Sequence, residues 1–439
     1  MSRRPVVIVG AGGRDFHVFN TCYREDATYE VVAFTAAQIP NIADRRYPPV
    51  LAGPHHPDGI PIRDEAELEA ILAEHPGAHV VFAYSDVSRD AVDHLARRVQ
   101  AAGGTFALFD PDATMLTSRL PCLAVCAVRT GCGKSPIARA IAARLRDRGW
   151  RVAVLRHPMP YGNLKRQAVQ RFATLDDLAQ HECTIEEIEE YEPHVAAGQV
   201  VYAGVDYEPI LRAAEAEADV ILWDGGNNDT PFVRPDLWIT VLDPLRAGDE
   251  VDYFPSQWNL ERADVLVINK IGEADATSLD LLRTNIAAHN PDARVVEGRL
   301  PVTLDNPGAV AGRRVLVVED GPTATHGGMG FGAGYLAATR AGAEVIDPRP
   351  FAQGDLKRAY EDYPHLRDVV PALGYGEQQR NDLEATIAAA ECDVVVVGTP
   401  IDLTRIVKIA KPVVRARYEY EDASTPGLLA IAAEYVATG

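Results

Sequence analysis

The sequence has few cysteines and no long apolar run. None of the six cysteines (22, 122, 126, 132, 183 and 392) forms a Cys-x-x-Cys pair, the spacing typical of metal and redox sites, so we interpret them as reduced residues of a cytosolic protein. No apolar stretch approaches the ~18 residues of a membrane span. The first residues lead into an apolar strand without the pattern of a signal peptide. We therefore expect a cytoplasmic protein with no membrane partner.

Positive charge is also scarce. The 439 residues include 43 Lys and Arg against 63 Asp and Glu, a formal net charge of −20. Binding to nucleic acid requires a basic face, so this balance predicts no nucleic-acid partner. The length predicts two to three domains, and with 47% hydrophobic residues each of them can bury a core.

A phosphate-binding loop is the central motif of the chain. An apolar run at residues 123–128 predicts a buried strand, and residues 137–145 have the apolar spacing of a helix. The turn between them is predicted to bind a nucleotide through Arg129, Thr130, Gly131, Cys132, Gly133, Lys134 and Ser135. Glycines let successive N–H groups point at phosphate oxygens, and the helix N-terminus adds partial positive charge. Lys134 is expected to reach the terminal phosphates and Ser135 to ligate Mg²⁺. Val128 stands where the usual G-x-x-x-x-G-K-[ST] pattern has its first glycine.

Two later strands end in residues that suit a nucleotide site. The run Val220 to Trp223 ends at Asp224, about ninety residues after the loop, where Mg²⁺-binding NTPases require a carboxylate. A strand at 264–268 ends at Asn269 and Lys270, the start of a guanine-reading pattern, but Gly272 replaces its aspartate. We therefore predict ATP as the nucleotide, with Asn269 and Lys270 close to it. The Glu-rich run at 186–190, in a stretch (164–190) expected to be helical, is interpreted as a solvated helix face.

The first 120 residues alternate strands with helix-length segments, which predicts a parallel sheet. The strand at residues 5–9 runs into a glycine-rich turn, but Asp15 replaces the third glycine of a dinucleotide motif. The second strand lacks the carboxylate that would hold a ribose. A small phosphorylated ligand is therefore favoured over NAD, with surface charge as the alternative for the arginines. Its predicted binding residues here are Gly12, Gly13, Arg14, His17, Arg45 and Arg46.

The fold class predicted is α/β with three-layer parallel-sheet domains. A Rossmann-like domain (1–120) would be followed by a P-loop NTPase domain (121–300) and a smaller α/β C-terminal region (301–439). In the last region a glycine-rich stretch follows a strand at 314–318. There, Glu319 and Asp320 are candidates for acid, base or metal roles, and Thr323, Thr325 and His326 for binding phosphate, with a flexible lid as the alternative.

Taken together, these motifs resemble the cyclic 2,3-diphosphoglycerate synthetase family. The resemblance is carried by residues 9–17, 38–41, 45–49, 83–87, 129–135, 156–162, 223–229 and 319–323, which span nearly the whole chain. It implies an ATP-dependent ligase that requires Mg²⁺ and closes a phosphoanhydride ring in 2,3-diphosphoglycerate, releasing ADP and phosphate. A homodimer is also implied.

This chemistry assigns roles to the predicted site. Lys134, Asp224, Arg156 and His157 would be catalytic, and Ser135 and Asp224 would hold the metal. Lys165 and Arg166 would join the N-terminal arginines in binding the substrate. Two other classes stay open: a regulatory or metallochaperone-like GTPase or ATPase that acts on a protein partner, and a nicotinamide-dependent enzyme.

Overall fold

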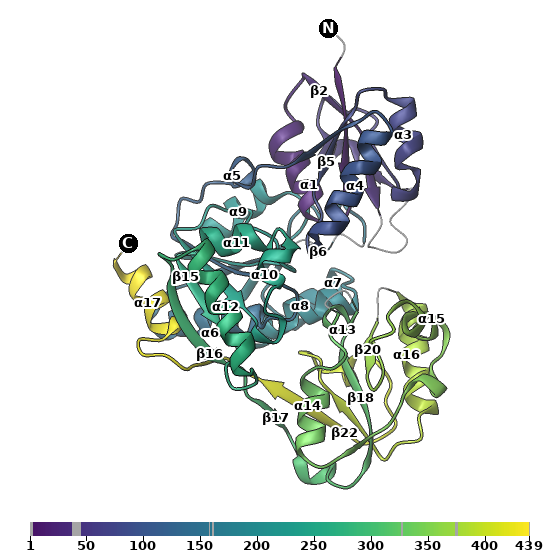
Figure 1. Cartoon of the computed structure of the whole chain (residues 1–439), viewed down its shortest axis with the longest axis vertical. Coiled ribbons are helices and arrows are strands. Elements are labelled where there is room, and N and C mark those ends of the chain that lie inside the picture. The colour runs from purple at the N-terminus through teal and green to yellow at the C-terminus, as the bar shows by residue number, and fades with distance from the viewer. Residues whose placement is uncertain are drawn as a thin grey trace.

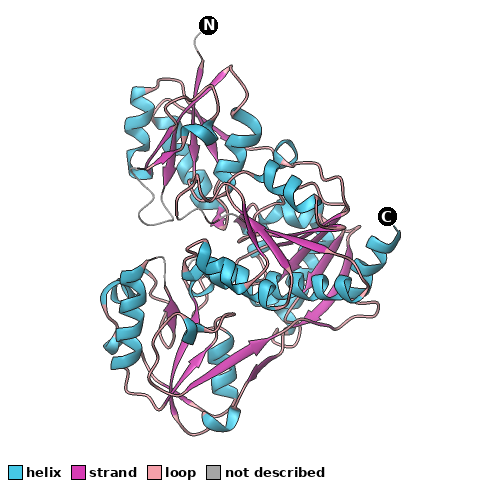
Figure 2. Cartoon of the chain, turned by 180° about the vertical axis from the view of Figure 1, so that it is seen from behind, coloured by secondary structure: helices cyan, strands magenta, loops and turns pink. Residues whose placement is uncertain are grey.

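The computed structural model describes residues 3–36, 45–157, 159, 162–325, 328–373 and 376–438, and shows an α/β fold with three large, mainly parallel sheets (Figure 1). The predicted fold class is thus confirmed. We call the parts built on these sheets the N-terminal, central and C-terminal units. Figure 2 shows the three sheets from behind, each flanked by helices.

The N-terminal sheet has the strand order β3-β4-β2-β1-β5-β7, and β3 is antiparallel to its neighbour. Its strands are β1 (Arg4–Val9), β2 (Tyr29–Ala36), β3 (Arg46–Tyr47), β4 (Ile60–Asp64), β5 (His79–Phe82) and β7 (Thr105–Leu108). Its helices are α1 (Arg14–Val18), α2 (Pro49–Ala52), α3 (Leu68–Glu74), α4 (Arg89–Ala101) and α5 (Pro111–Thr114). The carboxyl ends of β1 and β5 point toward the central unit, as Figure 1 shows.

The central sheet has the order β10-β11-β9-β12-β8-β13-β15-β16-β23, with antiparallel strands at both edges. Its strands are β8 (Cys122–Ala127), β9 (Val152–Arg156), β10 (Gln170–Phe172), β11 (Val200–Ala203), β12 (Val220–Asp224), β13 (Leu237–Leu242), β15 (Val265–Ile268), β16 (Arg294–Arg299) and β23 (Glu421–Asp422). Its helices are α6 (Lys134–Asp147), α7 (Leu175–Gln180), α8 (Ile185–Ala196), α9 (Tyr207–Glu215), α10 (Asp249–Asp252), α11 (Ser256–Arg262) and α12 (Ala276–His289). β8 is buried along its whole length because helices cover both faces of the sheet. The helix expected over 164–190 is wrong at 170–172, where β10 pairs with β11.

The C-terminal sheet has the order β17-β22-β21-β18-β19, and β20 also pairs with β18. Its strands are β17 (Val302–Leu304), β18 (Arg314–Asp320), β19 (Glu344–Val345), β20 (Val370–Ala372), β21 (Val394–Val397) and β22 (Val413–Tyr418). Its helices are α13 (Gly321–Ala324), α14 (Ala333–Arg340), α15 (Gly354–Asp362) and α16 (Glu377–Ala389).

The end of the chain returns to the central unit. β23 pairs with β16, and α17 (Leu428–Thr438) buries Leu428, Ile431 and Val436 in the core of the central sheet. Figure 1 shows α17 beside β15 and β16. The predicted C-terminal region, 301–439, therefore differs from the structure in its last segment, because these apolar side chains pack against the central sheet.

The N-terminal and central units are joined by a small two-stranded sheet and by aromatic packing. β6 (Val87–Ser88) pairs with β14 (Tyr253–Phe254). The Arg14 guanidinium lies 4.1 Å from the centre of the Phe232 ring, and the His17 ring stacks on the same phenylalanine at 4.0 Å. These buried contacts fix the N-terminal sheet against the carboxyl end of the central sheet.

Candidate functional site

The predicted phosphate loop connects β8 to α6 at the carboxyl edge of the central sheet. Gly131 and Gly133 have φ values of 85° and 94°, which favour glycine. A side chain on Gly133 would also collide with Asn269. No side chain of the described residues caps the N-terminus of α6, so its N–H groups are free to meet a phosphate.

Lys134, Ser135 and Asp224 come together at this helix end. The Ser135 hydroxyl lies 3.5 Å from Asp224 Oδ1. Burial lowers the pKa of Lys134, and the nearby Asp224 carboxylate partly offsets this effect. Neighbouring ligands on one octahedral Mg²⁺ lie about 3 Å apart, so the hydroxyl and carboxylate fit a magnesium ion. Among the described residues no group of three His, Cys, Asp or Glu side chains could hold a metal, so phosphate and water would complete this shell.

Arg156 holds the Asp224 carboxylate in place. Its guanidinium lies 2.6 Å from Asp224 Oδ2 and donates to the backbone carbonyls of Asp224 and Gly225. His194 Nε2 lies 3.0 Å from the same carboxylate oxygen, and Glu190 forms an ion pair with Arg156. Burial would raise the pKa of Asp224, but Arg156, His194 and Lys134 together hold it well below its ordinary value. Asp224 is therefore kept ionised beside the loop.

Asn269 and Lys270, the residues of the predicted guanine-reading pattern, support the phosphate loop by hydrogen bonds to its backbone. The Asn269 side chain donates to the carbonyl of Cys132 at 2.9 Å, and Lys270 Nζ donates to the carbonyl of Gly131 at 2.8 Å and pairs with Asp243 at 2.6 Å. Asn269 is fully buried. Both residues therefore lie at the nucleotide loop, but their side-chain donors are already used in hydrogen bonds that hold the loop in its conformation.

Arg129 and Thr130 anchor the start of the loop. Arg129 pairs with Asp86 of the N-terminal unit and with Asp249, each at 2.5 Å, and its guanidinium lies 3.6 Å from the centre of the Tyr253 ring. Thr130 Oγ1 donates to Asn227 Oδ1 at 2.9 Å. The Arg129 cation is therefore neutralised within the protein.

A chamber of about 200 Å³ opens in front of the loop, between the central and C-terminal units. The phosphate loop and α6 contribute Lys134, Ser135 and Arg139 to its lining. The other polar residues that line it are Thr130, Glu189, Glu190, Asn227, Lys270, Glu273, Glu319, Asp320, Thr323 and Tyr418. Apolar side chains, including Leu300, Val302, Met329, Phe331 and Leu336, form the rest of the wall. A Cβ on Gly131 would lie 3.0 Å from Thr323 Cγ2, so the C-terminal unit contacts the loop directly.

The burial of glutamates on α8 contradicts one prediction from the sequence. The run 186–190 was expected to be a solvated face, yet Glu186 and Glu187 are 1% exposed and Glu189 is 5% exposed. Glu189 lies against Asp320 of the C-terminal unit, and Glu187 accepts from Gln167 and from the backbone N–H of Thr184 within the central unit, so tertiary packing buries both. Glu319 is buried as well. Burial raises the pKa of Glu319 to about 7, although hydrogen bonds from the backbone N–H groups of Tyr335, Gly334 and Gly332 lower it in part.

The N-terminal residues predicted to bind substrate do not reach the chamber. The N–H groups of Gly12 and Gly13 donate to the Asp15 carboxylate, which occupies the place an anion would take. Arg14 donates to the Thr230 hydroxyl at 2.8 Å, and His17 Nε2 lies 2.7 Å from the carbonyl of Thr114. Both side chains are buried in the interface, which contradicts their assignment to an open substrate site.

The remaining predicted substrate residues also lie elsewhere. Arg45 and Arg46 donate to the backbone carbonyls of Gly162, Asp58 and Gly59. Lys165 is exposed, and Arg166 pairs at 2.9 Å with Glu182 on the surface. His157, a predicted catalytic residue, pairs with Asp229 at 2.8 Å and does not line the chamber. The predicted residue His326 lies outside the described residues.

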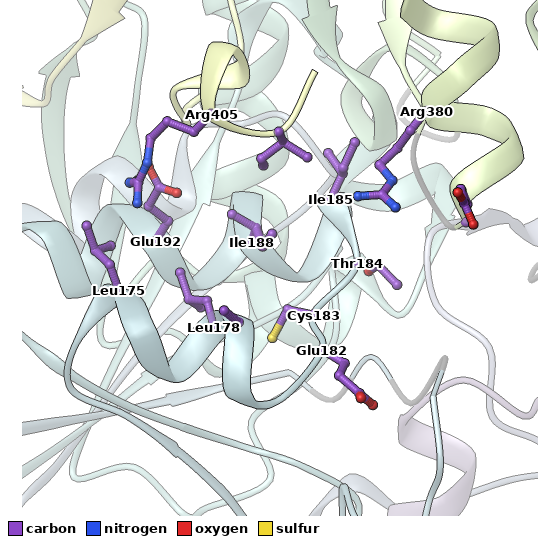
Figure 3. Close-up of a pocket in the computed structure, with 14 residues that line it drawn as sticks. Leu175, Leu178, Glu182, Cys183, Thr184, Ile185, Ile188, Glu192, Arg380 and Arg405 are labelled. Carbon is purple, nitrogen blue, oxygen red and sulfur yellow. The ribbon is translucent and has the colours of Figure 1, made fainter. Parts of the chain in front are cut away.

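A second cavity of about 480 Å³ lies beyond α8 (Figure 3). Leu175 and Leu178 of α7, Ile185 and Ile188 of α8, and the loop with Cys183 line one side of it, and Arg380 and Arg405 of the C-terminal unit line the other. Glu192 pairs with Arg405 at 3.5 Å. α8 thus presents its apolar residues to this cavity and Glu189 and Glu190 to the chamber.

The loop, its lysine and serine and the strand-end aspartate define the class of this protein, a P-loop nucleotide-binding α/β protein. No protein-family model matches the chain. Over 434 residues, 99% of this chain and 97% of the relative, it is 55% identical to the arginine synthetase ArcE of Thermococcus kodakarensis. The chain belongs to the family of that synthetase. This name differs from that of the family which the motifs resemble.

Solved structures show weaker similarity. LpxK from Aquifex aeolicus, in complex with ATP, has a TM-score of 0.43 and 12% identity, over 84% of this chain and 99% of that one. Cobyrinic acid a,c-diamide synthase from Mycobacterium smegmatis, with a bound ATP analogue and magnesium, has a TM-score of 0.20 and 17% identity, over 42% of this chain and 75% of that one. Both scores are low, so the class rests on this chain's own loop and sheets.

Two of the predictions on composition can be checked directly. The six cysteines are free, as expected of reduced residues. Within the ranges that the structure describes, no helix has both the length and the apolar character needed to cross a membrane.

Proposed function

We propose that this protein is an ATP-dependent synthetase whose product is arginine. The observation that carries the proposal is the placement of the phosphate loop, with Lys134, Ser135 and Asp224, at one end of a chamber rich in carboxylates. The name of the 55% identical relative supports the product. Carboxylates are the groups that recognise a guanidinium.

The chemistry follows from the product. A guanidinium differs from a ureido group by one nitrogen in place of oxygen, so the precursor is the ureido amino acid citrulline. Transfer of the γ-phosphoryl group of ATP to the ureido oxygen makes that oxygen a leaving group. Ammonia then forms the new C–N bond, and phosphate carries the oxygen away, giving ADP, phosphate and arginine. Mg²⁺, held by Ser135 and Asp224, would neutralise charge on the phosphates.

The chain's own residues position and stabilise these groups. Lys134 and the open N-terminus of α6 would hold the terminal phosphates. Arg156 is a positioning residue, since it keeps Asp224 ionised and oriented without lining the chamber. The apolar wall contributed by Phe331, Met329 and Leu336 would exclude water from the activated intermediate.

Ring closure of 2,3-diphosphoglycerate, implied by the motif resemblance, is the competing assignment. That substrate carries a carboxylate and two phosphates, and Glu189, Glu319 and Asp320 would oppose its charge. The arginines expected to neutralise it lie in the domain interface or on the surface. The homodimer stays a prediction.

The test is phosphate release from ATP and from GTP with Mg²⁺, each with citrulline and ammonium, with 2,3-diphosphoglycerate, and with no acceptor. We expect ATP turnover only with citrulline and ammonium, and arginine among the products. Lys134→Ala is expected to lower that turnover by at least about 100-fold, while Lys165→Ala, an exposed control, leaves it unchanged. Turnover only with 2,3-diphosphoglycerate would overturn the product assignment. GTP turnover without an acceptor would instead indicate a switch NTPase.

A further inference from the structure

A buried carboxylate of the chamber lacks a donor. Glu189 of α8 is 5% exposed, and neither of its side-chain oxygens accepts a hydrogen bond from an N–H group of the described residues; the side chain that it meets is another carboxyl group, that of Asp320. Asp320, at the end of β18, lies close enough to interact with it across the seam between the central and C-terminal units. A buried carboxylate without a donor is costly, so native structures rarely retain one without a ligand or a role.

The surroundings of Glu189 increase its need for positive charge. Asp320 and Glu186 add negative charge, and together with burial, the larger effect, they raise the pKa of Glu189 well above its ordinary value. Glu190, the next residue, has its counter-charge in Arg156. Tyr418 also lines the chamber, near Glu189, Asp320 and Glu319. No ion pair links Glu189 to Arg139 or Lys134 in the described part of the chain.

The position of Glu189 on α8 directs it to the phosphate site. Ile185, Ile188 and Glu192 take the side of the helix toward the second cavity, as Figure 3 shows. Glu189 and Glu190 line the chamber together with Lys134 and Ser135. A ligand held by Glu189 therefore shares an enclosed space with the phosphate loop.

From this arrangement we infer that Glu189 and Asp320 form the subsite for the cationic nitrogen group of the substrate pair, the guanidinium of arginine or the ammonium that becomes its nitrogen. The inference rests on the proposed function and specifies its substrate site. Two carboxylates from different units match the several N–H donors of a planar guanidinium. Bound there, the cation would replace the missing donors and link the two units.

The test compares binding of arginine with binding of citrulline, an uncharged analogue of nearly the same shape, by isothermal titration to the full-length protein. The variants are Glu189→Gln and Asp320→Asn. The matched control is Glu187→Gln, because Glu187 lies on the same helix and is equally buried but already bonds with Gln167 and with the backbone N–H of Thr184. ATP binding is titrated in parallel.

In the wild type we expect arginine to bind at least tenfold more tightly than citrulline. Glu189→Gln and Asp320→Asn are expected to abolish this preference and to leave ATP affinity within about twofold. Glu187→Gln keeps the preference. Glutamine keeps the shape of Glu189, and its amide can donate to Asp320, so the variant should fold, which circular dichroism checks.

The inference is overturned if Glu189→Gln retains the wild-type preference, or if the wild type binds arginine no more tightly than citrulline. Failure of the proposed function has a different signature. In that case the wild type forms no arginine from citrulline, ammonium and ATP, whatever the two ligands show in titration.

Discussion

Arg156 offers a quantitative test of how the site is held together. The perturbation is Arg156→Met, which keeps an unbranched stem that can pack in the same place and removes the charge. Arg156 is 2% exposed and Asp224 is fully buried, so the substitution leaves a carboxylate without its main counter-charge. Breaking a buried ion pair by removing one partner costs about 3–5 kcal/mol. We expect a loss of this size in the free energy of unfolding of the central unit.

The control is Arg166→Met. Arg166 and Glu182 form an ion pair at 2.9 Å, but their side chains are 63% and 73% exposed, so screening limits the loss to about 1 kcal/mol or less. Urea denaturation followed by tryptophan fluorescence suits both variants, since Trp150, Trp223, Trp238 and Trp258 all lie in the central unit. Equal losses in the two variants would refute the view that Arg156 compensates a buried charge.

The dependence on pH supplies a second criterion. In the wild type the depressed pKa of Asp224 stabilises the fold above the ordinary value of 3.8, and this contribution is lost as the pH falls through the folded-state pKa. In Arg156→Met, the effect of burial on Asp224 is no longer offset by the Arg156 cation. The ionised Asp224 carboxylate therefore destabilises the fold above pH 3.8. The difference between the two proteins should be largest near pH 7 and shrink toward pH 4. Adding Asp224→Asn to the variant should recover much of the loss, because the buried carboxylate that lost its main counter-charge is then neutral.

Three further predictions concern the groups around the site. Glu319→Gln should be more stable than the wild type at pH 8 but not at pH 4.5. Because folding raises the pKa of Glu319 from the ordinary 4.5 to about 7, the wild type loses about 3 kcal/mol of stability progressively as the pH rises between these values, and the glutamine variant does not. Thermal melts at both pH values check this, and identical differences would contradict it. Gly131→Ala should weaken ATP binding about tenfold through its positive φ and its contact with Thr323, and Thr323→Ser, which removes the contacting methyl group, should restore part of the affinity measured by titration. Asp15→Ala should destabilise the N-terminal unit by about 3 kcal/mol, because the buried N–H of Phe16 and those of Gly12 and Gly13 lose their acceptor; faster amide exchange in β1 alone is the expected signature, and unchanged exchange there would exclude it.

Local sequence was sufficient for much of the fold. The apolar runs predicted β1, β8, β12, β15 and β18 within one or two residues, because a strand covered on both faces must be apolar throughout. The phosphate loop was equally predictable. Its glycines, lysine and serine must follow one another in sequence to wrap a phosphate at a helix N-terminus, and Asp224 must end a neighbouring strand.

What the sequence could not determine was which charges find partners. The glutamates of α8 have the composition of a solvated face, yet Glu189 is buried beside Asp320 at the chamber and Glu187 is buried against Gln167. Arg14 and His17 resembled an anion site, but Asp15 already accepts from the loop's N–H groups and Phe232 stacks on both side chains. The sequence by itself determined the strands, the nucleotide loop and its aspartate, because these depend on neighbours along the chain. Only the tertiary structure decided which ionisable side chains line the chamber beside the loop, because a charge is buried, paired or left free by residues hundreds of positions away.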